Sequence, residues 1–264
     1  MKNILVPLGS SKNVLSHLQY AVDFANAFKA KLYIVQIYNL YTKAGTMINV
    51  DEIIQKESLA YLNNIVSQLD TKGVEVITKV LKGDLVDTLE LACKTAEIDL
   101  LILEPRTNSI KEEVFLGKTS GKIIKQTSIP ALIVPEGYKF KAPKNILMAV
   151  KSAFIKKDKV LTPLGEIKTK FKAKVSLLLV KTPHYKDTDF KVNKELSKLA
   201  DDITKTEGAT TFQGMLQYIL PNNPDMLCVV RRKRGFFTKL WEKNKILKKD
   251  LNSKIPILIL SGLK

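Results

Sequence analysis

The sequence has few of the residues that build disulfide frameworks, metal centres or catalytic triads. It contains two cysteines, Cys93 and Cys228, and two histidines, His17 and His184. The cysteines have no CxxC spacing, and neither histidine has a nucleophile and an acid in a recognisable arrangement. We therefore expect no disulfide, no metal site and no catalytic residue, and we expect both cysteines to be buried thiols.

Long hydrophobic runs are also absent. No apolar stretch approaches the roughly 18 residues that a membrane span needs, and the N-terminus enters a strand-like KNILVPL segment instead of a signal sequence. These features predict a cytoplasmic protein without a membrane span. The 45% hydrophobic content is nevertheless sufficient for real cores.

The second half of the chain repeats the first in degraded form. Residues 114–135, VFLGKTSGKIIKQTSIPALIVP, have a counterpart in residues 240–260, LWEKNKILKKDLNSKIPILIL. Pro256 follows Pro130 by 126 residues, and Asp225 follows Asp99 by the same interval. We interpret the chain as one unit used twice, with repeats at residues 1–138 and 144–264 and a linker between them.

Short apolar runs alternate with segments of helical period, which predicts parallel strands joined by right-handed crossovers. In the first repeat we expect strands at 3–8, 31–38, 74–81, 100–103 and 131–134, with helices between them. The second repeat is about 16 residues shorter between its second and fourth strands. There we expect helices at 154–171, 191–206, 215–220 and 236–250, and strands at 144–147, 173–180, 210–212 and 257–260.

Positive charge is concentrated in the second half. Residues 1–143 carry 17 Lys or Arg and 15 Asp or Glu, whereas residues 144–264 carry 26 and 11. Within this half, Arg231, Arg232, Lys233 and Arg234 form a basic cluster next to aromatic residues. The cluster is a candidate site for an anion or an acidic partner. Nucleic acid is an alternative partner, but scattered lysines favour an ordinary solvated surface.

The carboxyl ends of parallel strands are where an open α/β sheet binds ligands. In the first repeat, Gly9 and Ser10 follow a strand, and Gly117 opens a helix. Backbone amides at that helix start, with Lys118, Thr119 and Ser120, would suit an anion; an ordinary capped helix start is the alternative. A Walker motif is excluded because Glu112 stands where its first glycine is required.

Several of these stretches together resemble the universal stress protein family in its tandem two-domain form. They are KNILVPL, KLYIVQIY, the run from LLILEPR to PALIVP, and the repeated KNIL, IPALIV and IPILIL segments. The resemblance implies two Rossmann-like α/β units of the adenine-nucleotide-hydrolase type. Each would be a five-stranded parallel sheet flanked by helices, with the second unit shortened. The resemblance also implies dimerisation through the last strand. The family includes members that bind ATP and members that do not.

Nucleotide-binding members of that family carry an aspartate after the first strand and a G-x2-G-x9-G motif followed by Ser or Thr. Here Gly9 stands at the aspartate position, Glu104 and Thr107 replace the first two glycines, and Lys118 follows the surviving Gly117. The equivalent positions in the second repeat are Lys151, Val230, Lys233, Lys243 and Asn244. The resemblance therefore favours the fold and argues against ordinary ATP binding.

Three hypotheses follow. The first is a cytoplasmic, non-enzymatic stress-response or partner-binding protein with a degenerate nucleotide site and no cofactor, in which self-association or pairing of the two domains within the chain is expected. The second is an ATP or AMP sensor using Gly9, Ser10 and Val35 with the residues from Gly117 to Ser120. The third is a polyanion-binding module that uses the cluster from Arg231 to Arg234.

Overall fold

The computed structural model describes residues 1–9, 13–39, 50–105, 114–116, 118–155, 157–183, 185–231, 246–247 and 253–261. Contacts group these residues into two compact units. The first unit holds residues 1–104 and 136–140, and the second holds the described part of residues 105–135 and 141–264. The repeat boundaries at 1–138 and 144–264 stay a prediction from the sequence.

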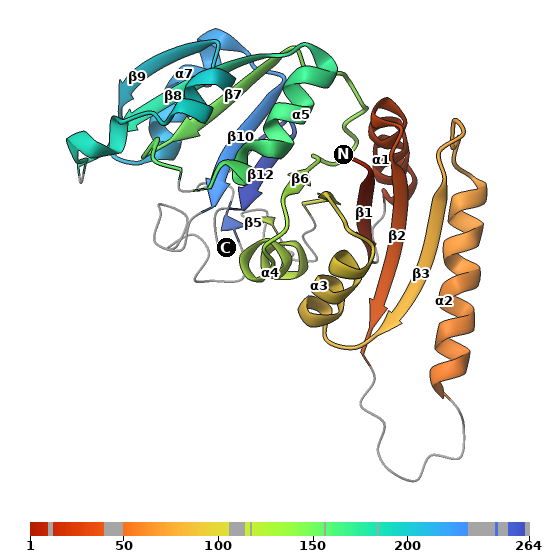
Figure 1. The fold of residues 1–264 in the computed structure, drawn as a ribbon. Coiled ribbons are helices and arrows are strands. Elements are labelled where there is room, and N and C mark those ends of the chain that lie inside the picture. Colours follow the sequence, from red (N-terminus) through yellow and green to blue (C-terminus); the bar gives the residue numbers. More distant parts are fainter. Residues whose placement is uncertain are drawn as a thin grey trace. The chain divides into compact units, whose positions relative to one another are not determined.

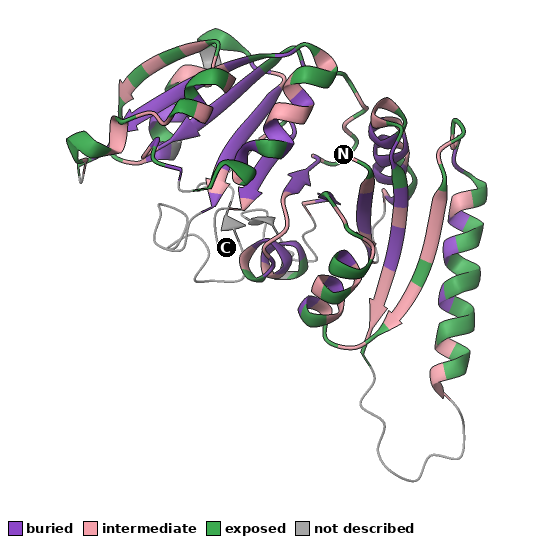
Figure 2. Ribbon diagram, viewed as in Figure 1, coloured by how far each residue is buried: buried purple, intermediate pink, exposed green. Residues whose placement is uncertain are grey.

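The first unit contains a four-stranded parallel sheet with the order β3-β2-β1-β4 (Figure 1). Its central strands are continuous apolar runs because both faces are covered; Ile4, Leu32 and Leu100 are fully buried. Figure 2 shows this buried band in purple. The strands are β1 Asn3–Leu8, β2 Lys31–Tyr38, β3 Val76–Lys82 and β4 Leu100–Leu103, and the helices are α1 Val14–Phe28, α2 Val50–Ser67 and α3 Leu85–Thr95.

The second unit contains a six-stranded sheet with the order β6-β12-β10-β7-β8-β9. Its strands are β6 Ala131–Ile133, β7 Asn145–Val150, β8 Lys174–Lys181, β9 Asp202–Glu207, β10 Met226–Arg231 and β12 Ile257–Ser261. Its helices are α4 Lys118–Gln126, α5 Thr162–Phe171, α6 Lys194–Leu199 and α7 Thr211–Asn222, with 3-10 turns η1 Asp158–Leu161 and η2 Asp187–Phe190. A small antiparallel pair joins β5 Val114–Leu116 to β11 Ile246–Leu247.

The predicted α/β fold with mainly parallel pairing is confirmed, and besides the small β5–β11 pair one further described pair departs from it. Strands β6 and β12, which end the two repeats, pair antiparallel. Leu132 faces Leu258, which lies 126 residues later and is its own repeat equivalent. On either side, Ala131 faces Ile259 and Ile133 faces Ile257. Reciprocal contacts of this kind are those of a two-fold symmetric interface.

The repeat is also visible in the hydrogen bonds that start each sheet. The Asp99 carboxylate accepts the N–H groups of Lys2 and Asn3 at 2.5 and 3.1 Å. The Asp225 carboxylate accepts the N–H groups of Lys144 and Asn145, both at 2.9 Å. The same side chain therefore fixes the first strand of each repeat at the amino edge of its sheet.

The shortened middle of the second repeat differs from the sequence prediction. Helix α2 has 18 residues, whereas α6 has only six and ends at Leu199. The predicted helix at 191–206 is therefore wrong in its second half, where Asp202 begins strand β9. The predicted strand at 210–212 is also wrong, because Thr210 caps α7 by accepting the Gln213 N–H. The predicted helix at 236–250 lies outside the described residues except at 246–247, which form a strand.

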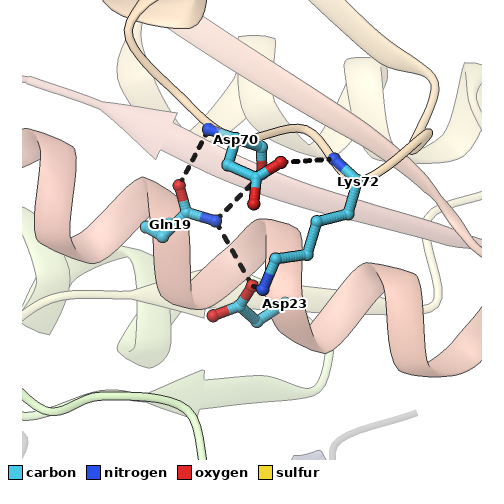
Figure 3. Close-up of polar contacts among 4 residues, drawn as sticks. All are labelled: Gln19, Asp23, Asp70 and Lys72. Carbon is cyan, nitrogen blue, oxygen red and sulfur yellow. Dashed lines mark hydrogen bonds and ion pairs between the residues drawn. The ribbon is translucent and has the colours of Figure 1, made fainter.

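Hydrogen bonds and an ion pair at the amino edge connect the turn before β3 to α1 (Figure 3). Gln19 donates to the Asp70 carbonyl at 3.0 Å and accepts the Asp70 N–H at 3.1 Å. Lys72 forms an ion pair with Asp23 at 2.7 Å. In the second unit, Lys168 of α5 holds the turn before β9 in a similar manner, by donating to the Leu199 carbonyl and the Asp201 carboxylate at 2.7 and 2.8 Å.

The first residues of the predicted linker, 136–140, belong to the first unit and pack against α1. The rings of Tyr138 and Phe140 lie 6.2 and 5.6 Å from that of Tyr20 in α1. Phe140 also packs edge-on against Phe24 at 6.0 Å. Burial raises the pKa of the Tyr20 hydroxyl, and the neighbouring Tyr138 adds to the effect. The segment thus completes the hydrophobic cover of α1.

Candidate functional site

The carboxyl edge of the first unit holds two of the predicted nucleotide-site residues. Gly9 directly follows β1 and is half-buried. Val35, in β2, is 2% exposed and belongs to the core. The third predicted residue at this edge, Ser10, lies outside the described residues.

Glu104 is a buried side chain among the described residues of this edge. It directly follows β4, and its residue is only 5% exposed. A side chain in this position takes up room beside the backbone. A glycine would present only backbone N–H and carbonyl groups at the same place.

The remaining predicted phosphate-binding residues belong to the start of α4. The predicted helix is confirmed, and it begins at Lys118. Thr119 is exposed, whereas Ser120 is 5% exposed; the Lys118 side chain and the whole of Gly117 lie outside the described part. Helix α4 belongs to the second unit and Gly9 to the first. A phosphate cradle built from both therefore stays a prediction.

Arg231 is buried instead of lying on an open basic surface. It ends β10, is 5% exposed, and donates from Nη2 to the carbonyl oxygen of Thr127. Thr127 follows the last residue of α4, so the guanidinium lies at the negative end of that helix. This contact ties β10 to α4. The neighbouring Arg232, Lys233 and Arg234 lie outside the described residues.

The second repeat presents a different set of groups at its carboxyl edge. Lys151 directly follows β7, at the position equivalent to Gly9, and Val230 stands in β10 at the position equivalent to Glu104. Lys233, Lys243 and Asn244 fall outside the described residues. Sequence reasoning did not single out Thr182 and Thr211, which are buried at this edge. For Thr182 the available signal was its position as a polar residue directly after an apolar strand.

The two thiols are inert in their surroundings. Cys93 and Cys228 are free and buried, as predicted. Burial, with a smaller contribution from Glu90, raises the pKa of Cys93 to about 12, and burial raises the pKa of Cys228 still further. Within the described residues, no group of three or more His, Cys, Asp or Glu side chains could hold a metal ion. No described helix is long and apolar enough to cross a membrane.

Comparisons with known proteins agree on one family. The model of the universal stress protein family matches residues 1–135. A universal stress protein of Methanocaldococcus jannaschii is 21% identical over 138 residues, which cover 50% of this chain and 81% of that protein. These matches lie over a length that corresponds to one repeat.

Solved structures extend the similarity to the whole chain. A universal stress protein from Archaeoglobus fulgidus superposes with a TM-score of 0.70 at 17% identity, covering 98% of this chain and 96% of that one. A protein of unknown function from Pseudomonas aeruginosa gives a TM-score of 0.63 at 14% identity, covering 98% and 92%. At these identities the likeness concerns the fold.

Proposed function

The chain belongs to the universal stress protein family, whose model matches slightly more than half of its residues, and from this premise we propose a non-enzymatic, partner-binding role with a lapsed nucleotide site. Family membership supports a role in the response to stress. The proposal adds that the protein acts through its surfaces in the cytoplasm, without hydrolysing or retaining ATP or AMP.

The observation that carries the proposal is the buried Glu104 at the end of β4. The resemblance to nucleotide-binding members calls for a glycine at this position, where the backbone meets phosphate. A 5% exposed carboxyl side chain takes that space here. Since a glycine leaves the backbone bare and a glutamate does not, the usual close approach of phosphate to the backbone is unfavourable. In the second repeat, the equivalent Val230 likewise places a side chain where the motif has a glycine.

The antiparallel pairing of β6 with β12 supports a second element of the proposal. Its reciprocal register joins the two repeats within one chain through the strands that the resemblance assigns to dimerisation. A short covalent connection gives the second repeat a high effective concentration near the first. We therefore assign the final strands to internal pairing and leave the remaining surfaces for partner proteins.

Calorimetric titration of the full chain with ATP, AMP and cyclic AMP tests the lapsed site. We expect no saturable heat up to about 1 mM ligand, which corresponds to a binding free energy weaker than roughly −4 kcal/mol. Glu104→Gly is the informative variant, because it removes the carboxylate and restores the bare backbone. Any gain of nucleotide heat in this variant identifies Glu104 as the residue that closes the site.

Micromolar binding to the unmodified chain would contradict the proposal. If Gly117→Trp then abolished that binding, the sensor hypothesis would replace the lapsed site. A matched control is Thr169→Trp, at an exposed position of α5 in the second repeat. The same samples, incubated with ATP, should release no phosphate above the rate in buffer.

A further inference from the structure

Phe154 is an exposed aromatic residue in the loop that follows β7. Its exposed fraction is 55%, although its neighbours Ala153 and Ile155 are buried. Hydrogen bonds fix the backbone on both sides of it. The Ala153 N–H donates to the Asp189 carbonyl at 2.7 Å, and the Ile155 carbonyl accepts from the Asn193 amide at 3.1 Å. The ring is therefore open to a ligand without any rearrangement of the backbone.

Two further rings lie beside this loop. Asp189 belongs to η2, and the next residue, Phe190, packs against Tyr185 with 4.5 Å between the ring centroids. Both rings belong to half-buried residues. The Lys181 ammonium lies 5.8 Å from the centre of the Tyr185 ring, and that of Lys205 lies 6.0 Å from the centre of the Phe190 ring. This carboxyl edge of the second repeat thus combines aromatic rings with positive charge.

The two segments that carry these rings are rich in lysine. Residues 151–159 contain four lysines and one aspartate, and residues 181–191 contain three lysines and two aspartates. The hydrogen bond from the loop to η2 brings the two segments to one edge, so lysines that look scattered in the sequence lie in adjacent segments. Among the residues that the structure describes, no ion pair involves Lys151, Lys186 or Lys191.

The acidic residues of this edge leave its charge positive. Glu207 and Lys181 neutralise each other in an ion pair at 3.1 Å. The Asp189 carboxylate accepts the backbone N–H that opens η2, at 3.0 Å. Asp187 and Asp158 carry the other two negative charges. With Glu207 included, seven lysines stand against four acidic residues, a surplus of three positive charges. The edge therefore favours a negatively charged partner.

Rings and lysines at one edge fit a single-stranded nucleic acid. Its unpaired bases stack on aromatic side chains, and its phosphates attract lysines. A duplex keeps its bases stacked on one another and offers no free base to these rings. A lipid bilayer fits less well, because Phe154 is the one exposed large apolar side chain among the described residues of the two segments. One ring buries little apolar area in a membrane interface.

We propose that this edge binds single-stranded nucleic acid. The lysine–aromatic surface consists of three aromatic residues and three lysines: Phe154, Tyr185, Phe190, Lys151, Lys186 and Lys191. A base stacks on the open ring of Phe154, neighbouring bases contact the Tyr185–Phe190 pair, and the lysines contact phosphates. The proposal adds a class of ligand to the partner-binding role and does not involve the nucleotide site at Glu104. A mononucleotide offers one base only, so the surface does not retain ATP or AMP.

Fluorescence anisotropy of a labelled oligo-uridine of about 20 nucleotides, titrated with the full chain, tests the surface; this length exceeds the site sizes of about 4–16 nucleotides found for single-strand-binding folds. We expect saturable binding that weakens as salt rises. Phe154→Ala should weaken it about tenfold, as for the loss of one stacked base. The matched control is Leu91→Ala, at a residue 65% exposed on α3, which should not change binding. Both variants should keep the melting temperature of the unmodified chain, because both side chains are exposed.

Replacement of the three lysines of the surface by glutamine tests its charge. The combined change should reduce the slope of log K against log salt concentration by about 2, at roughly 0.7 for each phosphate contact. The charge-matched control replaces three exposed lysines of the first unit by glutamine, namely Lys56, Lys79 and Lys94. This control removes the same net charge elsewhere and should leave the slope nearly unchanged.

Absence of saturable binding overturns the proposal, as does equal binding by Phe154→Ala and the unmodified chain, or an equal change of slope in the lysine variant and its control. Binding lost only when residues 232–234 are replaced by serine, or only in Gly117→Trp, assigns the oligonucleotide to another surface and rejects this one. Binding to vesicles of phosphatidylcholine and phosphatidylglycerol, without binding to the oligonucleotide, rejects it in favour of an anionic membrane. The titration with ATP and AMP decides the lapsed nucleotide site separately, so the two proposals can fail independently.

Discussion

The pairing of β6 with β12 can be broken at the two residues that lie on its local two-fold axis. Leu132 and Leu258 face each other, and both are fully buried. Truncation of either to alanine removes three carbon atoms from a packed interior and leaves a cavity. For a fully buried leucine, this change costs about 2–5 kcal/mol in the free energy of unfolding.

Urea denaturation followed by far-ultraviolet circular dichroism measures that cost for Leu132→Ala, Leu258→Ala and the double variant. Because the two side chains oppose each other across one strand pair, the second truncation enlarges a cavity that already exists. We expect the double variant to deviate from additivity by about 0.5–3 kcal/mol. Leu91→Ala, at a residue 65% exposed on α3, is the control and should change stability by less than about 0.5 kcal/mol.

Two results would refute this reasoning. A cost below about 1 kcal/mol for both single variants would mean that the strands do not bury these side chains together. Strict additivity would mean that Leu132 and Leu258 lie in separate environments. In either case, internal pairing of the repeats would lose its support.

Three further predictions concern single residues. Asp225→Ala removes the acceptor of two backbone N–H groups at the start of β7 and should lower the free energy of unfolding by about 1–3 kcal/mol, measured by urea denaturation against the exposed-site control Glu57→Ala. Desolvation opposes ionisation of Asp201, but its bonds from Lys168 and the Val175 N–H outweigh this and lower its pKa below 3.8. The contribution of Asp201 to the free energy of unfolding should therefore be complete above pH 3.8 and disappear as pH falls through the lowered pKa. If the free energies of unfolding of the unmodified chain and of Asp201→Asn differed by a constant amount across this range, that result would contradict the prediction. With a pKa of about 12, Cys93 should react with a thiol reagent at pH 8 only after unfolding, and rapid labelling of the native protein would show that it is accessible.

The parts of the fold that follow local rules were predictable from sequence. Continuous apolar runs marked β1, β2 and β4, and the matching intervals from Asp99 to Asp225 revealed equivalent positions in the two repeats. Both aspartates accept N–H groups at the start of a first strand. A carboxylate before an apolar run was a useful signal because the strand start leaves amide groups to satisfy.

Errors arose where the second repeat is shortened. Residues 202–207, DITKTE, contain Ile203 as their one apolar residue and have no continuous apolar run, because β9 is an edge strand with one exposed face. Thr210 was assigned to a short strand, yet it caps α7. The context of the edge, rather than propensity, decides both cases.

The sequence predicted where the candidate residues lie along the strands and helices, but not what surrounds them. Sequence placed Glu104 at the end of a strand, and the structure adds that this carboxyl group is buried. The same method treated Arg231 as part of a basic surface cluster, whereas it is buried and bonded to the Thr127 carbonyl, 104 residues away in sequence. Contacts between residues so far apart follow from the sheet order, which sequence does not specify.

The proposal that the nucleotide site has lapsed is tested most directly by what the protein retains from the cell. The full chain, purified without added nucleotide, is denatured, and the released small molecules are quantified by liquid chromatography and mass spectrometry. We predict far less than one adenine nucleotide per chain. Recovery of ATP or AMP in equimolar amount, abolished in Gly117→Trp, would contradict the account and assign the first repeat a working nucleotide site.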